Sequence, residues 1–235
     1  MPHPSAALPS SAPPPANPKR PVCTRCALPL ASCLCRWITP TTNQAHVLLL
    51  QHPQEALQAK GTARLLRLSL QHCECQVGEV FDAAVLGPAS GLQTWLLYPA
   101  APDTSTNAAT SAAAPPLRHA CADTGTNPSH CRLLLLDGTW RQARHLLRAN
   151  PWLLALPRWP LLTPPPSRYC IRLAQRPAQR STLEAACLAL ATLESTPERY
   201  NPLLAALDGW VASCAERVDW ADRTDRADPA ATPAT

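Results

Sequence analysis

The sequence predicts an α/β fold built on a mostly parallel β-sheet that is flanked by helices. Short apolar segments, typical of buried strands, alternate along the chain with longer segments of helical spacing. The clearest strand is 132–136, where one arginine precedes four leucines and Asp137-Gly138 follows. The clearest helix start is Ser181-Thr182-Leu183-Glu184, a capping-box pattern in which a hydroxyl residue precedes a glutamate by three positions.

The remaining elements are predicted from apolar spacing and from the residues that interrupt it. Strands are expected at 45–51, 79–86 and 94–98, and helices at 61–72, 139–148, 182–194 and 202–216. A His-Pro step ends the first strand, and Asn150-Pro151 ends the helix that follows Asp137. The chain has 235 residues, which is enough for one domain with its own core.

Composition divides the chain into a folded part and segments without periodic apolar residues. Residues 1–20 form a Pro/Ala-rich arm and residues 218–235 a charged tail, and both are expected to be disordered. Between them we expect a small cysteine-rich unit at 21–38 and the main domain at 44–217. A low-complexity insertion rich in Ala, Thr and Pro interrupts the main domain at about 99–130, which is long for a loop in a compact fold.

Composition also excludes several classes of protein. No apolar run approaches the roughly 18 residues of a transmembrane helix, so no membrane association is expected. The proline-rich N-terminus lacks the apolar core of a secretory signal, which favours a cytoplasmic, reducing location. The 11 cysteines are therefore interpreted as metal ligands or buried thiols rather than disulfides. Nothing in the sequence indicates an obligate protein partner.

Four of the cysteines have the spacing C-x2-C-x6-C-x-C, namely Cys23, Cys26, Cys33 and Cys35. Four thiolates suit a tetrahedral structural zinc ion, and a C-x2-C turn presents two of them to one ion, so we predict a zinc knuckle. The alternatives are chance clustering and a redox motif, although a redox C-x2-C is expected at a strand-to-helix turn. The other seven cysteines are interpreted as buried or incidental thiols, with Cys73-x-Cys75 as a weaker second pair.

Positive charge is concentrated in the middle of the chain. The whole sequence has a formal net charge of +5, but residues 132–180 contain nine arginines and a single acid, Asp137. An arginine cluster of this kind is typical of a surface that binds a phosphate backbone. The alternative is a solvated surface with scattered bases.

Asp137, Gly138 and Thr139 follow the strand predicted at 132–136, so they lie at the carboxyl end of a parallel sheet. Ligands of open α/β sheets bind at this end, and a glycine lets the backbone approach a ligand closely. Because Asp137 is the only acid in the arginine-rich region, we expect arginines to surround it and to keep it ionised. The alternative is that Asp137 caps the helix that follows.

Several separated motifs make the chain resemble the DTW-domain proteins between about 23 and 210. Asp137-Gly138-Thr139-Trp140 matches their D-x-T-W signature, and the four-cysteine pattern resembles theirs. Further matches, in the same order, are His52-Pro53 with Glu55, 60–65 (KGTARL), 141–144 (RQAR), Ser167-Arg168-Tyr169-x-x-Arg172 and 181–185 (STLEA). Two features depart from the family: Gly61 stands where an asparagine is usual, and the insertion at 99–130 is unusually long.

The resemblance implies a tRNA-uridine aminocarboxypropyltransferase with a SPOUT-like α/β fold, which is knotted in a related enzyme. Such enzymes transfer the 3-amino-3-carboxypropyl group of S-adenosylmethionine to N3 of a tRNA uridine, in bacteria within the variable loop. The other product is 5′-methylthioadenosine. Ribosomal RNA is an alternative substrate, and the alternative functions are an S-adenosylmethionine-dependent RNA methyltransferase and a non-catalytic zinc-knuckle protein that binds RNA.

Under this resemblance, the residues of the D-x-T-W signature are the expected catalytic group. Asp137 is the expected general base for uridine N3, and Thr139 is expected to hydrogen-bond Asp137 or the cofactor. Trp140 is either a core residue, which its helical spacing with Ala143 favours, or a stacking platform for a base. Glu184 is either a second carboxylate of the site or only the capping-box partner.

The remaining predicted contacts involve the cofactor and the RNA. Arg168 or Arg172 is expected to hold the cofactor carboxylate as a bidentate fork. The rest of the expected cofactor site comprises Thr62, Leu136 and Gly138. The expected tRNA contacts are Arg141, Arg144 and Arg148.

Overall fold

The computed structural model describes residues 21–87, 91–99, 127–161, 164–169 and 180–225, with side chains up to Ala215. Its centre is a four-stranded sheet, which consists of β1 (His46–Gln51), β2 (Cys73–Val77), β3 (Gln93–Leu96) and β4 (Cys131–Asp137). The strand order is β2-β1-β4-β3, and all three pairings are parallel. The predicted α/β class is therefore confirmed.

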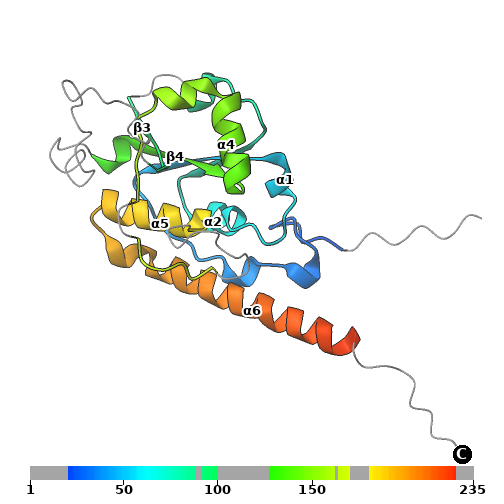
Figure 1. Cartoon of the computed structure of the whole chain (residues 1–235). Coiled ribbons are helices and arrows are strands. Elements are labelled where there is room, and N and C mark those ends of the chain that lie inside the picture. The colour runs from blue at the N-terminus through cyan, green and yellow to red at the C-terminus, as the bar shows by residue number, and fades with distance from the viewer. Residues whose placement is uncertain (1–20, 88–90, 100–126, 162–163, 170–179, 226–235) are drawn as a thin grey trace, which may run out of the picture.

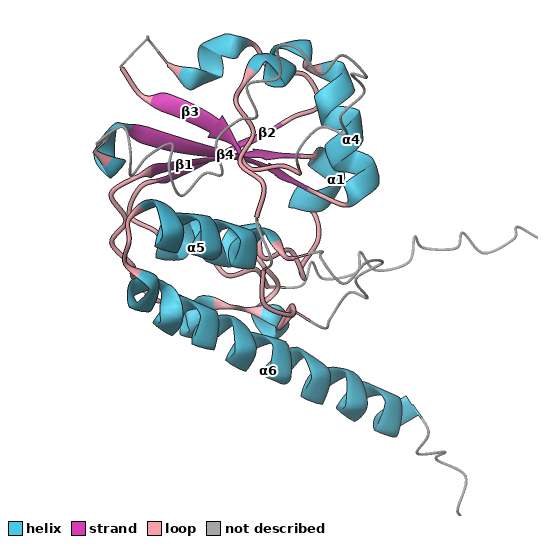
Figure 2. Cartoon of the chain, turned by 60° about the vertical axis from the view of Figure 1, so that its left-hand side comes forward, coloured by secondary structure: helices cyan, strands magenta, loops and turns pink. Residues whose placement is uncertain are grey.

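Helices cover both faces of the sheet (Figures 1 and 2). On one face lie α2 (Ala63–Ser69), α5 (Thr182–Leu193) and the long α6 (Asn201–Asp225), with α6 outside α5. On the other face lies α4 (Trp140–Ala149), which begins directly after β4. A single-turn helix, α1 (Pro53–Ala56), follows β1.

The alternation of side chains along β1 and β4 decides which core each leucine joins. Leu49 and Leu135 belong to the core beneath α2 and α5, whereas Leu50 and Leu134 belong to the core beneath α4. Because successive side chains of a strand point to opposite faces, Asp137, two residues after Leu135, continues the row that faces α5. This parity places the candidate catalytic carboxylate on the α5 face.

Three predicted elements differ from the structure. The strand expected at 79–86 is wrong, because Asp82 caps a 3-10 turn at Ala83–Leu86 instead. The strand β2 was missed because its sequence, CECQV, has few apolar residues; it lies at an edge of the sheet, where pairing with β1 suffices. The last helix extends to Asp225, beyond the predicted end at 216, and the helix predicted at 61–72 covers only Ala63–Ser69.

Several predictions fall outside the described residues. These are the arm at 1–20, the insertion between 100 and 126, Arg172, and the tail beyond Asp225. Among the helices that the structure describes, none combines the length and the apolar character needed to cross a bilayer. The SPOUT-like knot stays a prediction.

The cysteine-rich segment packs onto α6 rather than standing apart from the domain. Its Cys26, Leu28 and Leu34 are buried in the same core as Leu207 and other residues of α5 and α6. Trp37 lies against Gly209 of α6, where a Cβ atom on residue 209 would overlap the Trp37 ring. Only glycine therefore fits this position of α6 while the knuckle is docked.

We predict that Gly209→Ala destabilises the protein. In an open helix this change stabilises by about 1 kcal/mol, but here the added methyl overlaps the Trp37 ring, and overpacking of a core typically costs about 1–3 kcal/mol. Urea unfolding should therefore show a lower midpoint for the variant. Adding Trp37→Leu should recover part of the loss, and an unchanged or higher midpoint for Gly209→Ala alone would contradict the packing described.

Candidate active site

Asp137 is the last residue of β4, and its carboxylate is buried at the carboxyl end of the sheet with only 3 % of the residue exposed. Gln51, the last residue of β1, pairs with it in register and donates a hydrogen bond from Nε2 to Oδ2 at 2.6 Å. Thr182, the first residue of α5, donates from Oγ1 to Oδ1 at 2.5 Å. Two strands and one helix therefore meet at this carboxylate.

Two of the groups that contact the Asp137 carboxylate are neutral donors. Among the described residues, an amide and a hydroxyl donate to its two oxygens, and the predicted arginine surroundings stay a prediction. A carboxylate has about four acceptor positions, and these two bonds each engage one of its oxygens. Its main-chain oxygen accepts a third bond, from the His52 N–H at 3.0 Å, which fixes the backbone as well.

The residues after Asp137 build the start of α4. Gly138 has φ +156°, and a Cβ there would lie 3.0 Å from the Gln142 side chain, so the glycine is required by both conformation and space. Thr139 is the N-cap and forms a capping box with Gln142. The helix is thus capped by Thr139 and not by Asp137, and the expected bond from Thr139 to Asp137 is replaced by this cap.

Trp140 lies at the surface, with 37 % of the residue exposed, so the prediction that it belongs to the core is wrong. Its ring centroid is 5.7 Å from that of Tyr98, and the Arg158 guanidinium lies 5.5 Å from the Tyr98 ring. The main chain holds this group together, because Tyr98 N–H donates to the Trp159 carbonyl at 3.2 Å. Two aromatic rings and a cation therefore adjoin one another where β3 and β4 end.

The start of α5 is fixed by Glu184, which is buried and completes the predicted capping box with Ser181. Its carboxylate also accepts bonds from the Ser167 hydroxyl at 2.8 Å and the Arg168 N–H at 2.6 Å. Glu184 therefore holds 167–168 beside α5 and serves as the capping-box partner. Thr62 joins the same region, since its hydroxyl accepts from the Leu183 N–H at 3.3 Å.

The other predicted contact residues fall into two groups. Arg168 pairs with Asp208 of α6 at 2.8 Å on the exposed side of the α5 layer. Leu136 faces the opposite core, beneath α4, away from Asp137. The structure thus brings Thr62 and Arg168 to the α5 face with Asp137, and separates Leu136 from them.

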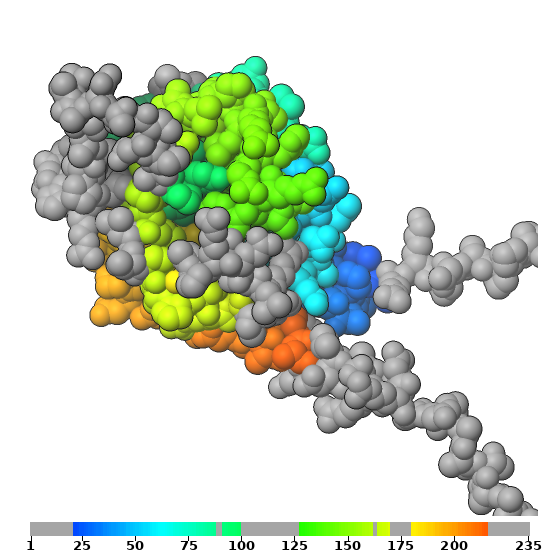
Figure 3. Space-filling view, viewed as in Figure 1, coloured from blue at the N-terminus to red at the C-terminus, as the bar shows by residue number. Residues whose placement is uncertain are grey.

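The predicted RNA contacts lie on the α4 face. All three arginines of this group are exposed and follow one side of the helix, namely Arg141, Arg144 and Arg148. The surface of α4 forms part of the face seen in Figure 3 (green). The arginine surface and the buried carboxylate are therefore on opposite sides of β4, joined by the turn at 138–139.

Next to the site is a cluster that sequence reasoning missed. Glu79 lies 3.4 Å from His52 Nε2 and 3.6 Å from His145 Nε2, and so connects the end of β1 to α4. His52 Nδ1 accepts the Gln54 N–H, so its Nε2 carries the proton and faces Glu79. The only sequence signal was the His-Pro step, because Glu79 and His145 are distant in sequence.

The four predicted metal ligands do come together. Their sulfur atoms all lie within 4.8 Å of one another, with Cys23–Cys35 at 3.6 Å and Cys26–Cys33 at 3.7 Å. A zinc–sulfur bond of about 2.3 Å in a tetrahedron gives sulfur–sulfur separations of about 3.8 Å, so the arrangement fits one zinc ion. Main-chain N–H groups of Cys26 and Arg25 lower the pKa of Cys23 to about 6, whereas burial and the neighbouring sulfurs raise the pKa of Cys35 to about 12, so a metal would have to displace the Cys35 proton on binding.

Comparison with known proteins shows the family of the chain. The family model described as DTW domain matches residues 20–215, which include both the cysteine cluster and the Asp137 corner. The chain belongs to the DTW domain family. No solved structure gives a significant match.

Three curated relatives of this DTW domain are named tRNA-uridine aminocarboxypropyltransferase 2. The mouse protein is 32 % identical over 75 % of this chain, the Drosophila melanogaster protein 32 % over 80 %, and the Macaca fascicularis protein 30 % over 80 %. The matches cover 57 %, 73 % and 62 % of those relatives, respectively. The chain thus spans only part of the length of each of these proteins.

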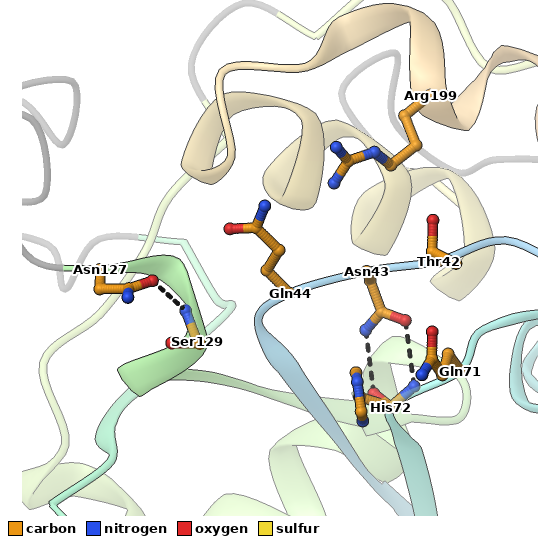
Figure 4. Close-up of a pocket in the computed structure, with 8 residues that line it drawn as sticks. All are labelled: Thr42, Asn43, Gln44, Gln71, His72, Asn127, Ser129 and Arg199. Atoms are coloured by element: carbon orange, nitrogen blue, oxygen red, sulfur yellow. Dashed lines mark hydrogen bonds between the residues drawn. The ribbon is translucent and has the colours of Figure 1, made fainter.

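A pocket of about 550 Å³ lies at the other end of the sheet of the DTW domain, where the strands begin (Figure 4). It is lined by residues that precede β1, β2 and β4, together with Arg199. Asn43 closes its floor by exchanging two hydrogen bonds with the His72 main chain, both at 3.0 Å. Since β1 and β4 span six or seven residues, this pocket and Asp137 are about 20 Å apart.

We predict that Cys26→Ser lowers the zinc content of the purified protein well below one ion per chain and lowers its thermal midpoint. The serine hydroxyl is a poor substitute for a thiolate, and residue 26 is buried in the core that the knuckle shares with α6. Elemental analysis by mass spectrometry measures the metal. Cys73→Ser, at a half-buried position of β2, is the matched control. Equal zinc in wild type and Cys26→Ser would rule out this site.

Proposed function

We propose that this DTW domain transfers the 3-amino-3-carboxypropyl group of S-adenosylmethionine to N3 of a tRNA uridine, in the variable loop, and releases 5′-methylthioadenosine. The observation that carries the proposal is the match to the DTW domain family over residues 20–215, with relatives named for aminocarboxypropyl transfer to tRNA uridine. A buried, oriented carboxylate within the D-x-T-W signature supports it chemically.

Asp137 would act on the nucleophile. Uridine N3 carries a proton, and its lone pair attacks carbon effectively only as that proton leaves. Asp137 accepts the proton while the N3–C bond forms and the C–S bond breaks, and the electron pair of the broken bond remains on sulfur. The buried carboxylate also favours a cation nearby, because a charge in a low-dielectric site interacts strongly with its neighbours.

S-adenosylmethionine supplies the aminocarboxypropyl group on a sulfonium, which is a good leaving group. The carboxylate of S-adenosylmethionine needs a cation as its partner. Arg168 can supply this cation, because its pair with Asp208 is half exposed and such a pair contributes about 1 kcal/mol or less to stability. Gly138 follows Asp137 in the chain. Thr62 accepts from the Leu183 N–H, next to Thr182, which binds Asp137. These residues fit a zwitterionic co-substrate on the α5 side of the sheet.

The α4 face would bind the tRNA. Arg141, Arg144 and Arg148 present three cations along one exposed side of the helix, which suits a row of phosphates. Trp140 at its first turn lies beside Tyr98, and exposed aromatic rings with a neighbouring cation suit a stacked, unpaired base. The RNA surface would thus lead to the turn at 138–139, which directly follows Asp137.

We predict that RNA takes up label from S-adenosylmethionine labelled in the carboxyl carbon and not from the methyl-labelled form. Asp137→Asn keeps the shape of the side chain but removes the base, so transfer should fall by about 100-fold or more, while tRNA binding stays within twofold. Nucleoside mass spectrometry identifies the modified uridine and its position.

Each other result of this labelling experiment has a definite meaning. Methyl label in RNA would identify a methyltransferase instead. RNA binding without either label and without binding of S-adenosylmethionine would identify a non-catalytic RNA-binding protein. Transfer to ribosomal RNA but not to tRNA would contradict the proposed substrate, and a fully active Asp137→Asn would contradict the proposed base.

We predict that Arg144→Glu weakens tRNA binding and makes its salt dependence shallower. Losing one phosphate contact reduces the slope of log K against log salt by about 1. Fluorescence titration between low and moderate salt measures this slope. Arg67→Glu is the control, because Arg67 is an exposed arginine of α2 on the opposite face of the sheet. Identical slopes for wild type and Arg144→Glu would place the RNA elsewhere.

A further inference from the structure

We propose that Gln51 and Thr182 are positioning residues, which hold the Asp137 carboxylate ionised and aimed at the substrate proton. This inference rests on the proposed function for the role of Asp137, but its physical content is testable without the reaction. Neither residue belongs to the D-x-T-W signature, and the two come from segments 86 and 45 residues away from Asp137.

The position of Gln51 follows from the register of the sheet. Gln51 and Asp137 are paired residues at the ends of adjacent parallel strands, so their side chains project from the same face. The short bond to the carboxylate orients the amide, with Nε2 toward Asp137 and Oε1 toward the Cys75 sulfur at 3.9 Å. Burial and the nearby Asp137 raise the pKa of Cys75, so it stays a thiol that suits this oxygen.

The position of Thr182 follows from the capping of α5. The Leu183 N–H donates to the Thr62 hydroxyl and the Glu184 N–H to the Ser181 hydroxyl. These two N–H groups of the first turn therefore already have acceptors other than Asp137. The Thr182 hydroxyl is therefore the group through which the start of α5 reaches Asp137. A twelve-residue helix also places its positive end near the carboxylate, which favours the anion.

Together the two donors restrict both the charge and the orientation of Asp137. Hydrogen bonds to both oxygens restrain rotation of the carboxylate and so fix the directions in which its oxygens point. Hydrogen bonds to the charged form of an acid favour that form. Removing a donor should therefore let Asp137 take up a proton at a higher pH, and a protonated Asp137 is inactive as a base.

The test compares Thr182→Val and Gln51→Met with matched controls elsewhere on α5 and on the neighbouring strand β2. Each change removes a donor at nearly constant volume. The acidic limb of the pH profile of kcat should shift to higher pH by about 0.5–1 pH unit. In addition, kcat should fall about tenfold, while KM for tRNA stays within twofold. Thr192→Val on exposed α5 surface and Gln76→Met on β2 should behave as wild type, and Thr182→Ser, which keeps the hydroxyl, should restore the wild-type limb.

A second measurement needs no catalysis. An acid that is stabilised as an anion in the folded state contributes stability above its unfolded-state titration, and this contribution is lost as the pH falls. The thermal midpoint of the wild type should therefore fall between about pH 5 and pH 2, and this fall should be smaller in Thr182→Val, as in Asp137→Asn.

The outcomes separate this inference from the proposed function. If the wild type transfers no aminocarboxypropyl group, the proposed function fails, and the midpoint comparison still decides the inference. If the wild type is active but Thr182→Val and Gln51→Met keep its acidic limb and its fall in midpoint, the positioning role is wrong. Equal loss of activity at every pH, with a limb that does not move, would also overturn it, because that pattern indicates a structural role only.

Discussion

The arrangement of the site depends on one buried carboxylate and on how its charge is satisfied. An ionised side chain removed from water costs several kcal/mol unless hydrogen bonds replace the lost hydration. At Asp137, hydrogen bonds from two neutral groups, Gln51 and Thr182, contribute to this. The strand ends and the start of α5 must therefore meet at this point, and the fold is organised around that meeting.

Sheet parity divides the proposed work between two faces. Asp137 follows the row of Leu133 and Leu135 toward α5, whereas α4, which begins three residues later, packs on the opposite face. Gly138 makes this change of direction possible through its positive φ. Under the proposed function, an RNA would lie along α4 and present one base at the turn, while a small co-substrate would occupy the α5 side. The Asp-Gly-Thr-Trp sequence would thus form a corner between the two proposed binding surfaces.

The sequence predicted those structural features that depend only on residues close together in the chain. The four leucines of β4, the capping box at Ser181 and Glu184, and the cysteine spacing each specify their structure within a few positions. Contacts between distant segments were missed: the partners of Asp137, the histidine cluster at Glu79, and β2, whose strand character comes from pairing with β1. Trp140 was assigned to the core because helical spacing shows which residues share a face but not what covers that face.

The cysteine knuckle is linked to the same site through packing. Its Leu34 is buried in the core with Leu207 of α6, and the neighbouring Asp208 pairs with Arg168. The Arg168 N–H is held by Glu184, which caps the helix that begins with Thr182. Since a structural zinc site contributes its binding free energy to folding, a metal bound by the four cysteines would stabilise this layer as a whole. The cysteine cluster and the proposed catalytic carboxylate are therefore parts of one packed unit.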